Sequence, residues 1–409
     1  MHLRARLFGI GVAALAGIPL AVLGPAGASQ AAVSPAAAPA SHAQKTAHSC
    51  ATSKPGFASC KAIVRTDLVQ SQATSNAAKP NATPSGFGPS SLQSAYNLPS
   101  STAGAGRTVA IVDAYDDPTA EADLAVYRAQ FGLPACTTAN GCFKKVSQTG
   151  GTSYPKKDGG WAQEISLDLD MVSAICPNCH ILLVEAKTSS FANLGAAVNQ
   201  AASTAGVVAI SNSYGGSDAS DASYGSYYNH PGIAVTASSG DSGYGASYPA
   251  SSHYVTAVGG TTLSTASNSR GWSETAWSGA GSGCSAYNTA LSGAASFGTG
   301  CANRAEADVS AVANPSTGVA VYDSTAYQGY VGWMVFGGTS VSSPVIASVY
   351  ALAGNTASID NNYPYTHSTS LNDVTSGSNG SCPTSQWCTA RAGWDGPTGL
   401  GTPNGIGAF

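Results

Sequence analysis

Charged side chains are scarce in this sequence. Lys, Arg, Asp and Glu together make up 9% of its 409 residues, whereas about 25% is usual in soluble proteins. The 17 basic residues are outnumbered by 21 acidic ones, so the formal net charge is −4. A nucleic-acid-binding protein is expected to show a basic patch and a high isoelectric point. The composition therefore argues against nucleic acid as a partner.

The composition fits neither a disordered chain nor collagen. Hydrophobic residues make up 43% of the sequence, enough to build a large core. The 48 glycines show no Gly-X-Y period, which a collagen helix requires. A globular protein is therefore expected.

Long apolar runs are missing outside residues 7–23. This run follows two arginines and precedes the small residues 26–28, which is the order found in a secretory signal peptide. The alternative is a membrane anchor, but spanning a bilayer takes about 20 apolar residues. We expect residues 1–28 to be a signal peptide cleaved after Ala28, with cleavage three or four residues later as the alternative. The mature protein is then secreted and free of the membrane.

The rest of the chain divides into two parts. Residues 29–85 are rich in Ala, Ser, Pro and Thr and show little apolar periodicity, which predicts a leader or short pro-segment with one small looped element. No long linker or repeat follows, so residues 86–409 are expected to form one domain of catalytic size.

A second Cys-x-x-Cys motif is absent, and no His near Cys176 and Cys179 has zinc-finger spacing. The ten cysteines instead fall into five couples that are close in sequence. An even number of cysteines in an exported chain predicts five disulfides. A redox pair or half of a zinc site at Cys176 and Cys179 is the weaker alternative. The five couples are 50 and 60, 136 and 142, 176 and 179, 284 and 301, and 382 and 388.

Short apolar runs alternate with helical patterns after residue 86. Such a pattern is typical of βαβ units in an α/β fold, with a mostly parallel sheet that carries helices on both faces. Functional sites in open sheets of this kind lie at the carboxyl ends of the strands. Strands are predicted at 109–112, 181–184, 207–210, 233–237 and 255–258, and helices at 120–131, 161–174 and 194–205.

The segment 337–344 reads GGTSVSSP and runs into an apolar helical stretch. Ser340 is expected at the entrance of that helix, where backbone N–H groups and the helix dipole favour negative charge. A nucleophile that attacks a carbonyl needs such surroundings, because its tetrahedral intermediate is an oxyanion. The structural alternative is a helix N-cap rich in Ser and Thr.

An acidic pair lies on the predicted helix 161–174. Glu164 and Asp168 are four residues apart and share one helix face. Two close carboxylates tend to share a proton and titrate as a unit. The alternative is a solvated acidic face, which the apolar neighbours and the low charge of the chain disfavour.

Two further segments follow apolar strands. One reads ASSGDSG over 237–243 and contains Asp241, and the other reads SNSYGG over 211–216. Each of them, taken alone, is also compatible with an ordinary turn.

Taken together, these segments resemble the sedolisins, the serine-carboxyl peptidases, which share the nucleophile motif at 337–344 with the subtilisins. The resemblance covers residues 86–409 and implies a subtilisin-like fold. It implies Ser340 as nucleophile, Glu164 as general base and Asp168 as the proton-sharing partner of Glu164. It also implies Asp241 as the side-chain donor to the oxyanion.

The resemblance further implies that Ser213, Gly215 and Gly216 line the substrate, and that the protein is a secreted endopeptidase acting on proteins or peptides. Asp241 must be protonated to donate a hydrogen bond, whereas a carboxylate base still works in acid, where His is protonated. We therefore expect a bell-shaped rate profile in the acidic range. A monomer is expected.

Two alternatives remain open. A subtilisin-like peptidase would use Asp113 with a different base, although none of the seven histidines lies in a subtilisin-like segment. A catalytically silent extracellular protein of the same fold would retain the architecture alone.

The C-terminal region is similar to the sedolisin calcium site. The resemblance implies one structural Ca²⁺ held by the side chains of Asp373 and Asp395 and by the carbonyls of Val374, Arg391 and Gly393. Such hard oxygen ligands suit Ca²⁺. The chain departs from the family at Arg391, where Gly is common, and at its N-terminal leader, which is too short for the large folded pro-domain of sedolisins.

Overall fold

The computed structural model describes residues 44–68 and 83–409. The predicted signal peptide, residues 1–28, lies outside these ranges. Ala43–Phe409 form one compact unit, so residues 44–68 belong to the same folded body as the predicted peptidase domain. The division of the chain at residue 86 stays a prediction.

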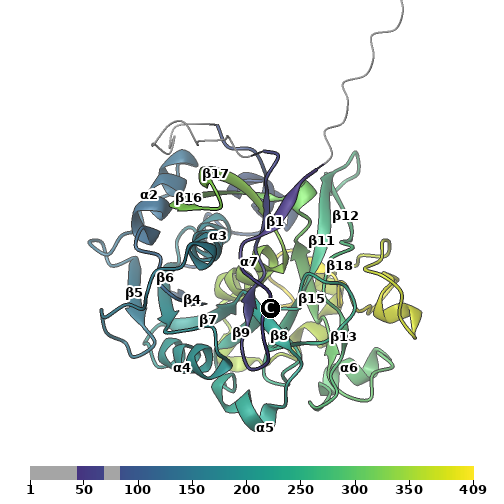
Figure 1. Ribbon diagram of the computed structural model, residues 1–409. Coiled ribbons are helices and arrows are strands. Elements are labelled where there is room, and N and C mark those ends of the chain that lie inside the picture. Colours follow the sequence, from purple (N-terminus) through teal and green to yellow (C-terminus); the bar gives the residue numbers. More distant parts are fainter. Residues whose placement is uncertain (1–43, 69–82) are drawn as a thin grey trace, which may run out of the picture. The chain divides into compact units, whose positions relative to one another are not determined.

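An eight-stranded sheet forms the centre of this unit (Figure 1). Its order is β12-β11-β9-β7-β4-β6-β5, and β15 also pairs with β11. All of these pairs are parallel except β11 with β12, which confirms the predicted α/β, mostly parallel sheet. The strands are β4 (Thr108–Ala114), β5 (Phe143–Ser147), β6 (His180–Ala186), β7 (Val207–Asn212), β9 (Ala234–Ser238), β11 (Thr256–Thr265), β12 (Trp272–Ala276) and β15 (Val309–Val312).

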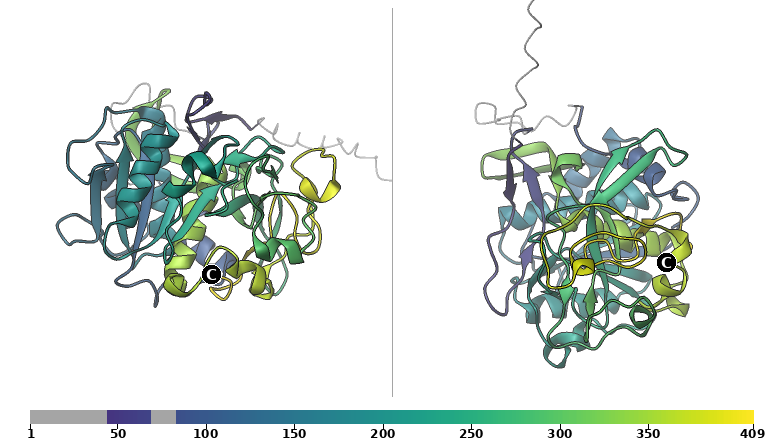
Figure 2. Two further views of the ribbon diagram at one scale, coloured as in Figure 1. Left: turned by 90° about the horizontal axis from the view of Figure 1, so that it is seen from below. Right: turned by 90° about the vertical axis from the view of Figure 1, so that its right-hand side faces the viewer.

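Helices cover both faces of the sheet, as Figures 1 and 2 show from three directions. Alternate residues of a strand enter opposite layers, because strand side chains have a period of two. In β4, Val109 and Ile111 face one hydrophobic cluster, and Ala110 and Val112 face the other. The first layer holds α1 (Pro89–Ala95), α2 (Ala120–Gln130), α3 (Gly159–Ile175) and α7 (Thr339–Ala353), and the second holds α4 (Phe191–Ala202).

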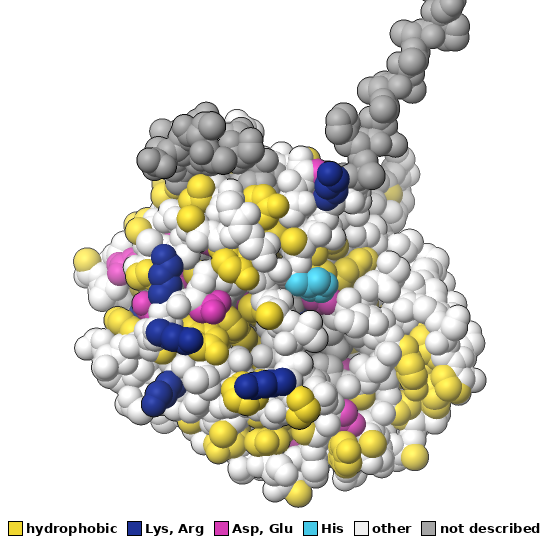
Figure 3. Space-filling view, in the orientation of Figure 1, with side chains coloured by type: hydrophobic (Ala, Val, Ile, Leu, Met, Phe, Trp, Pro, Cys, Tyr) yellow, Lys and Arg dark blue, Asp and Glu magenta, His cyan; other side chains and the backbone are white. Residues whose placement is uncertain are grey.

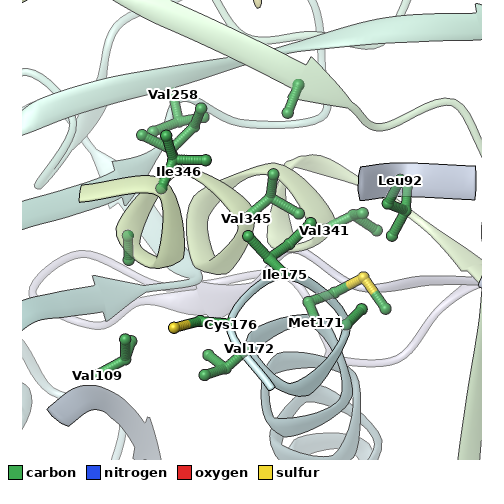
Figure 4. Packing of buried hydrophobic residues seen from close by; sticks show 14 of the residues in the cluster. Leu92, Val109, Met171, Val172, Ile175, Cys176, Val258, Val341, Val345 and Ile346 are labelled. Carbon is green, nitrogen blue, oxygen red and sulfur yellow. The ribbon is translucent and has the colours of Figure 1, made fainter. Parts of the chain in front are cut away.

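Helices α3 and α7 pack against each other at the centre of the first layer. Met171, Val172 and Ile175 of α3 lie against Val341 and Val345 of α7 (Figure 4). Every residue of α3 from 160 to 175 is buried, because the sheet, α7 and a β-hairpin enclose the helix. The alternative of a solvated acidic face is therefore wrong for this helix.

The hairpin consists of β16 (Val319–Tyr327) and β17 (Tyr330–Gly337), and it carries two N-terminal strands at its edge. Strand β3 (Ile63–Arg65) pairs with β17, and β1 (Thr46–His48) pairs with β3. Neither the hairpin nor the N-terminal strands were predicted. Strands of two or three residues are too short to show a period and form only when the partner strand is present.

A second small sheet has the order β10-β8-β2, in which β8 (Tyr214–Ser217) is central. Strand β2 (Ser59–Cys60) comes from the N-terminal segment, and β10 (Ser247–Tyr248) lies at the other edge. The remaining elements are α5 (Asp221–Tyr224), β13 (Gly283–Cys284), α6 (Ser292–Ser296), β14 (Ala305–Glu306), α8 (Tyr363–Thr366), β18 (Leu371–Asn372) and β19 (Thr402–Pro403), together with 3-10 turns at 225–227, 315–317, 356–358, 368–370 and 385–387.

Most predicted element boundaries are close to the observed ones. Two elements are exceptions. Strand β11 continues to Thr265, beyond its predicted end at 258, and helix α4 begins three residues before its predicted start at 194. The Ser190 side chain accepts a hydrogen bond from the Asn193 N–H (3.3 Å) and so caps the helix earlier.

All five predicted cysteine couples are disulfide-bonded, and no cysteine of the described residues is free. Within residues 44–68 and 83–409, no helix has the length and hydrophobicity needed to cross a bilayer. Charged side chains are sparse on the face shown in Figure 3, as the composition predicts.

Candidate active site

Ser340 lies in the first turn of α7, two residues after the N-cap Gly338. Gly338 has a φ of 93°, and a Cβ at this position would lie 1.8 Å from the carbonyl oxygen of Lys61. Only glycine allows this approach of two backbones. The Ser340 hydroxyl donates a hydrogen bond to the carbonyl of Ser213 (3.1 Å). The nucleophile candidate is thus at a helix N-terminus, as the sequence pattern predicts.

Glu164 and Asp168 of α3 point toward the same place and are fully buried. The Ser213 hydroxyl donates to Asp168 Oδ1 (2.8 Å), and the two carboxyl groups interact with each other. The Ser340 hydroxyl is close enough to Glu164 to act on its pKa, which burial raises well above the usual range and the Ser340 contact lowers. Glu164 Oε1 is buried and accepts no hydrogen bond.

A third buried acid, Asp113, stands beside this pair. It lies near the carboxyl end of β4, and neither of its oxygens has a hydrogen-bond partner. Burial raises the pKa of Asp113 to about 8. Besides burial, the charge of Asp113 raises the pKa of both Glu164 and Asp168. Because their negative charges repel one another, the three buried acids do not ionise independently, and they share protons.

The sequence analysis placed Asp113 only in the subtilisin-like alternative and not beside Glu164 and Asp168. The signal that could have found it is its position at the carboxyl end of a central strand, the edge where functional residues collect in parallel sheets.

Asp241 follows β9 and contacts the first turn of α7. Its Oδ1 accepts hydrogen bonds from the N–H and the hydroxyl of Thr339 (both 2.8 Å). Its Oδ2 is buried without a partner. Burial raises the pKa of Asp241, while Lys61 and Thr339 lower it. A carboxyl group with a raised pKa keeps its proton in mild acid and can then donate a hydrogen bond from Oδ2.

A cleft of about 450 Å³ opens next to Asp241. Of the predicted substrate-lining residues, Gly216 lies in its wall, Gly215 lies in β8, and Ser213 immediately precedes that strand. Residues of β2 already occupy one edge of β8, with Ser59 opposite Gly215. The predicted substrate strand is thus paired with a segment of the chain itself.

Asp170 of α3 takes no part in this cluster. Its Oδ2 accepts the N–H of Tyr322 in β16 (3.0 Å), which lies on the hairpin side of the helix. Helix α3 therefore contributes Glu164 and Asp168 to the candidate site, whereas Asp170 makes a structural contact with the hairpin.

The C-terminal loops gather the predicted calcium residues at the side of the molecule drawn in yellow (Figure 2). The Gly393 N–H donates to Asp373 Oδ2 (2.9 Å), and the Arg391 N–H donates to Asp395 Oδ2 (3.1 Å). Val374 is buried next to Asp373. Burial raises the pKa of Asp395 to about 7, and the charge of Asp373 also raises it. Since a cation would relieve this repulsion, the residues present fit a hard metal ion.

A second cluster of acids consists of Asp117, Asp123 and Asp323, whose carboxylate oxygens lie within 4.8 Å of one another. This spacing would also allow a shared cation. The sequence analysis missed the group because its members come from separate elements: the segment after β4, helix α2 and strand β16.

No protein-family model matches the sequence, but individual proteins do. Kumamolisin from Bacillus sp. (strain MN-32) is 30% identical over 373 residues, which cover 80% of this chain and 63% of kumamolisin. Sedolisin from Pseudomonas sp. (strain 101) is 28% identical over 78% of this chain and 60% of its own length. The chain spans about three fifths of the length of these curated relatives.

A solved structure agrees with these matches. Pseudomonas sedolisin, a serine-carboxyl proteinase complexed with two molecules of pseudo-iodotyrostatin, aligns with a TM-score of 0.65 and 26% identity over 79% of this chain and 96% of its own. Together these matches support a member of the sedolisin family. A psychrophilic protease aligns with a TM-score of 0.50 at 20% identity, which supports the shared fold alone.

Proposed function

We propose that this chain is a sedolisin-family serine-carboxyl endopeptidase that hydrolyses peptide bonds in acid. The observation that carries the proposal is the position of the Ser340 hydroxyl, at a helix N-terminus and beside the buried pair of Glu164 and Asp168. Export belongs to the proposal and is supported by five disulfides and by the N-terminal pattern of residues 1–28.

Ser340 is the nucleophile and Glu164 its general base. The hydroxyl turns from the Ser213 carbonyl to Glu164 Oε1, loses its proton to that carboxylate, and attacks the substrate carbonyl carbon. Asp168 shares a proton with Glu164, while the Ser213 hydroxyl fixes the orientation of Asp168. Glu164 then gives the proton to the leaving amine, and water hydrolyses the acyl-enzyme with Glu164 again as base.

Asp241 and the backbone N–H of Ser340 stabilise the oxyanion. The Oδ2 atom of Asp241 is suited to this role because it is buried and free of partners. It donates only when protonated, so activity falls as the pH rises through the pKa of Asp241, which burial has raised. Activity also falls toward low pH, because the coupled acids Glu164, Asp168 and Asp113 must together release one proton before Glu164 can act as base.

Ser340→Ala is expected to lower acid hydrolysis of casein by on the order of 10³-fold or more, because the acyl-enzyme cannot form. The measurement is the release of acid-soluble peptides from casein. Ser348→Ala is the matched control, since Ser348 is another buried serine of α7 and its hydroxyl has no partner. Equal digestion by wild type and Ser340→Ala would contradict the role of Ser340 as nucleophile and would favour the catalytically silent alternative.

A structural Ca²⁺ is proposed at Asp373, Asp395 and the carbonyls of Val374, Arg391 and Gly393. When bound, the ion supplies positive charge that holds the two carboxylates together; it takes no part in the reaction.

Addition of Ca²⁺ to chelator-treated protein is expected to raise the melting temperature by a few degrees, because an ion that binds only the folded state stabilises it. Asp373→Asn should abolish this shift, whereas Asp360→Asn, which alters an exposed carboxylate outside these loops, should keep it. If added Ca²⁺ leaves the melting temperature of the wild type unchanged, the proposed calcium site is wrong.

A further inference from the structure

Strand β16 departs from its regular pairing with β17 after Asp323. Irregularities of this kind turn side chains away from the positions of a regular ladder. The Ser324 N–H instead donates to Asp123 Oδ2 of α2 (2.9 Å). The Thr325 hydroxyl donates to Asp117 Oδ1 (3.2 Å). Asp117, Asp123 and Asp323, the three-aspartate cluster, therefore meet between β16, α2 and the segment after β4. In Figure 1 the elements α2 and β16 lie on the other side of the molecule from the C-terminal loops drawn in yellow.

The protein encloses the three-aspartate cluster. Asp117 and Asp323 are 0% exposed and Asp123 is 3% exposed, and one oxygen from each carboxyl group lies within 4.8 Å of the other two. Burial raises the pKa of Asp117 to about 6, and the charge of Asp123 adds to this rise. Burial, together with the charges of Asp117 and Asp123, raises the pKa of Asp323 well above its usual range. The three groups therefore repel one another when they are ionised.

The neighbouring lysines do not neutralise this charge. Lys145 forms ion pairs with Asp116 and with Glu185 (2.9 Å to Glu185). The charges of Lys145 and Lys157 each lower one pKa in the three-aspartate cluster. Among the ion pairs of residues 44–68 and 83–409, however, none includes a carboxyl group of the cluster.

Hydrogen bonds reach only one oxygen of Asp117 and one of Asp323. Asp117 Oδ1 accepts the Thr119 N–H (3.0 Å), and Asp323 Oδ1 accepts the Thr325 N–H (2.7 Å). Oδ2 of both residues is buried without a partner. A proton on either Oδ2 would be a buried donor without an acceptor, and a negative charge there would be buried without a partner. Both states are costly, and a cation bound between the two oxygens removes both costs.

We propose that the three-aspartate cluster holds a divalent cation with oxygen ligands, and that Ca²⁺ is the ion whose size fits. Two oxygens that bind one Ca²⁺ at about 2.4 Å are at most about 4.8 Å apart, a condition that the three carboxyl groups meet. The hydroxyls of Thr119 and Thr325 lie 3.0 Å and 3.2 Å from Asp117 Oδ1 and offer further oxygens. The inference does not rest on the proposed peptidase function, and this site is separate from the C-terminal calcium site.

The ion joins three parts of the chain around helix α3. Asp323 belongs to the hairpin that packs on α3, and the second strand of this hairpin ends at Gly337, three residues before Ser340. The ion therefore fastens the hairpin to α2 and to the segment after β4, and it takes no part in the reaction.

The two cation sites differ in their access to solvent. Asp373 of the C-terminal site is exposed, so a chelator in solution reaches an ion bound there. An ion in the three-aspartate cluster leaves only when the surrounding elements open, because its ligands are buried. We therefore expect it to survive treatment with a chelator.

The test measures the metal content of the purified full chain by plasma mass spectrometry. The protein is folded in the presence of Ca²⁺ and is then treated with excess chelator near neutral pH. Wild type should retain about one Ca²⁺ per chain. Asp323→Asn and Asp117→Asn should each retain none, because the amide carries no charge, although it can still accept the N–H bonded to Oδ1. Their melting temperatures should lie several degrees below that of wild type.

Two further variants are controls. Asp170→Asn is matched in burial, since Asp170 accepts the N–H of Tyr322, the residue before Asp323 in β16, and lies outside the cluster. It should retain the ion after chelation. Asp373→Asn, which alters the C-terminal site, should also retain it, so that the two sites are distinguished.

Three results would overturn the inference. The first is a chelator-treated wild type that holds no metal. The second is an ion retained by both Asp323→Asn and Asp117→Asn. The third is loss of the retained ion in Asp373→Asn, which would place that ion in the C-terminal loops. If one cluster variant does not fold, the wild type and the other variant still decide between these results. Because no readout uses casein hydrolysis, failure of this inference is distinguishable from failure of the proposed function.

Discussion

Glu164→Gln is expected to lower kcat/KM for peptide hydrolysis by roughly 10³- to 10⁴-fold, the upper range for a general acid–base group. The amide cannot accept the Ser340 proton, while its size and its ability to accept the Ala62 N–H are retained. Asp168→Asn is expected to cost less, because Asp168 acts through Glu164 rather than on the substrate. Its pH profile should shift, since the acids titrate together.

Asp170→Asn is the matched control for this experiment. Asp170 lies on the same helix, is equally buried, and has a pKa raised well above its usual range by burial. Its carboxylate accepts a backbone N–H of β16 and is not in the site, so the variant should retain wild-type kcat/KM. The mechanism fails if Glu164→Gln keeps its activity or if both variants lose the same amount.

Long apolar strands made most of the fold predictable. The buried strands of the sheet are continuous apolar runs, and their order in the sequence, alternating with helices, indicates parallel pairing. The N-terminal strands carry no such signal, because Ser59 and Cys60 become a strand only through the exposed edge of β8. Their pairing partner is more than 150 residues away in the sequence, so local patterns could not reveal it.

Local spacing also explains which site residues were found. Glu164 and Asp168 are one helical turn apart and Ser340 sits in a distinctive string, so each had a local signal. Asp113 and Ala62 acquire their positions only when β4, α3 and the N-terminal segment meet. The calcium ligands carried a signal only through resemblance, since Asp373 and Asp395 lie in separate loops.

The melting temperature is expected to be higher at about pH 4 than at about pH 7.5, by roughly 10 °C or more. Burial raises the pKa of Asp113 to about 8, and it raises the pKa of Asp168, Asp170 and Glu306 well above the usual range. The same acids titrate near pH 4 when unfolded. Between the unfolded and folded pKa values, the folded state binds more protons, so stability falls as the pH rises. The contribution is complete below about pH 4 and is lost toward the folded values.

Thermal unfolding of Ser340→Ala is the suitable measurement, because this variant cannot digest itself in acid. Each pKa unit corresponds to about 1.4 kcal/mol, so removal of one buried acid should reduce the difference between the two pH values measurably. Adding Asp170→Asn should do so, since the amide carbonyl can still accept the Tyr322 N–H without an ionisable group in its place. Adding Asp360→Asn, at an exposed position, should leave the difference unchanged. A protein that is most stable at neutral pH would mean that these carboxyl groups remain ionised in the folded chain, and the proton-sharing site would then lose its physical basis.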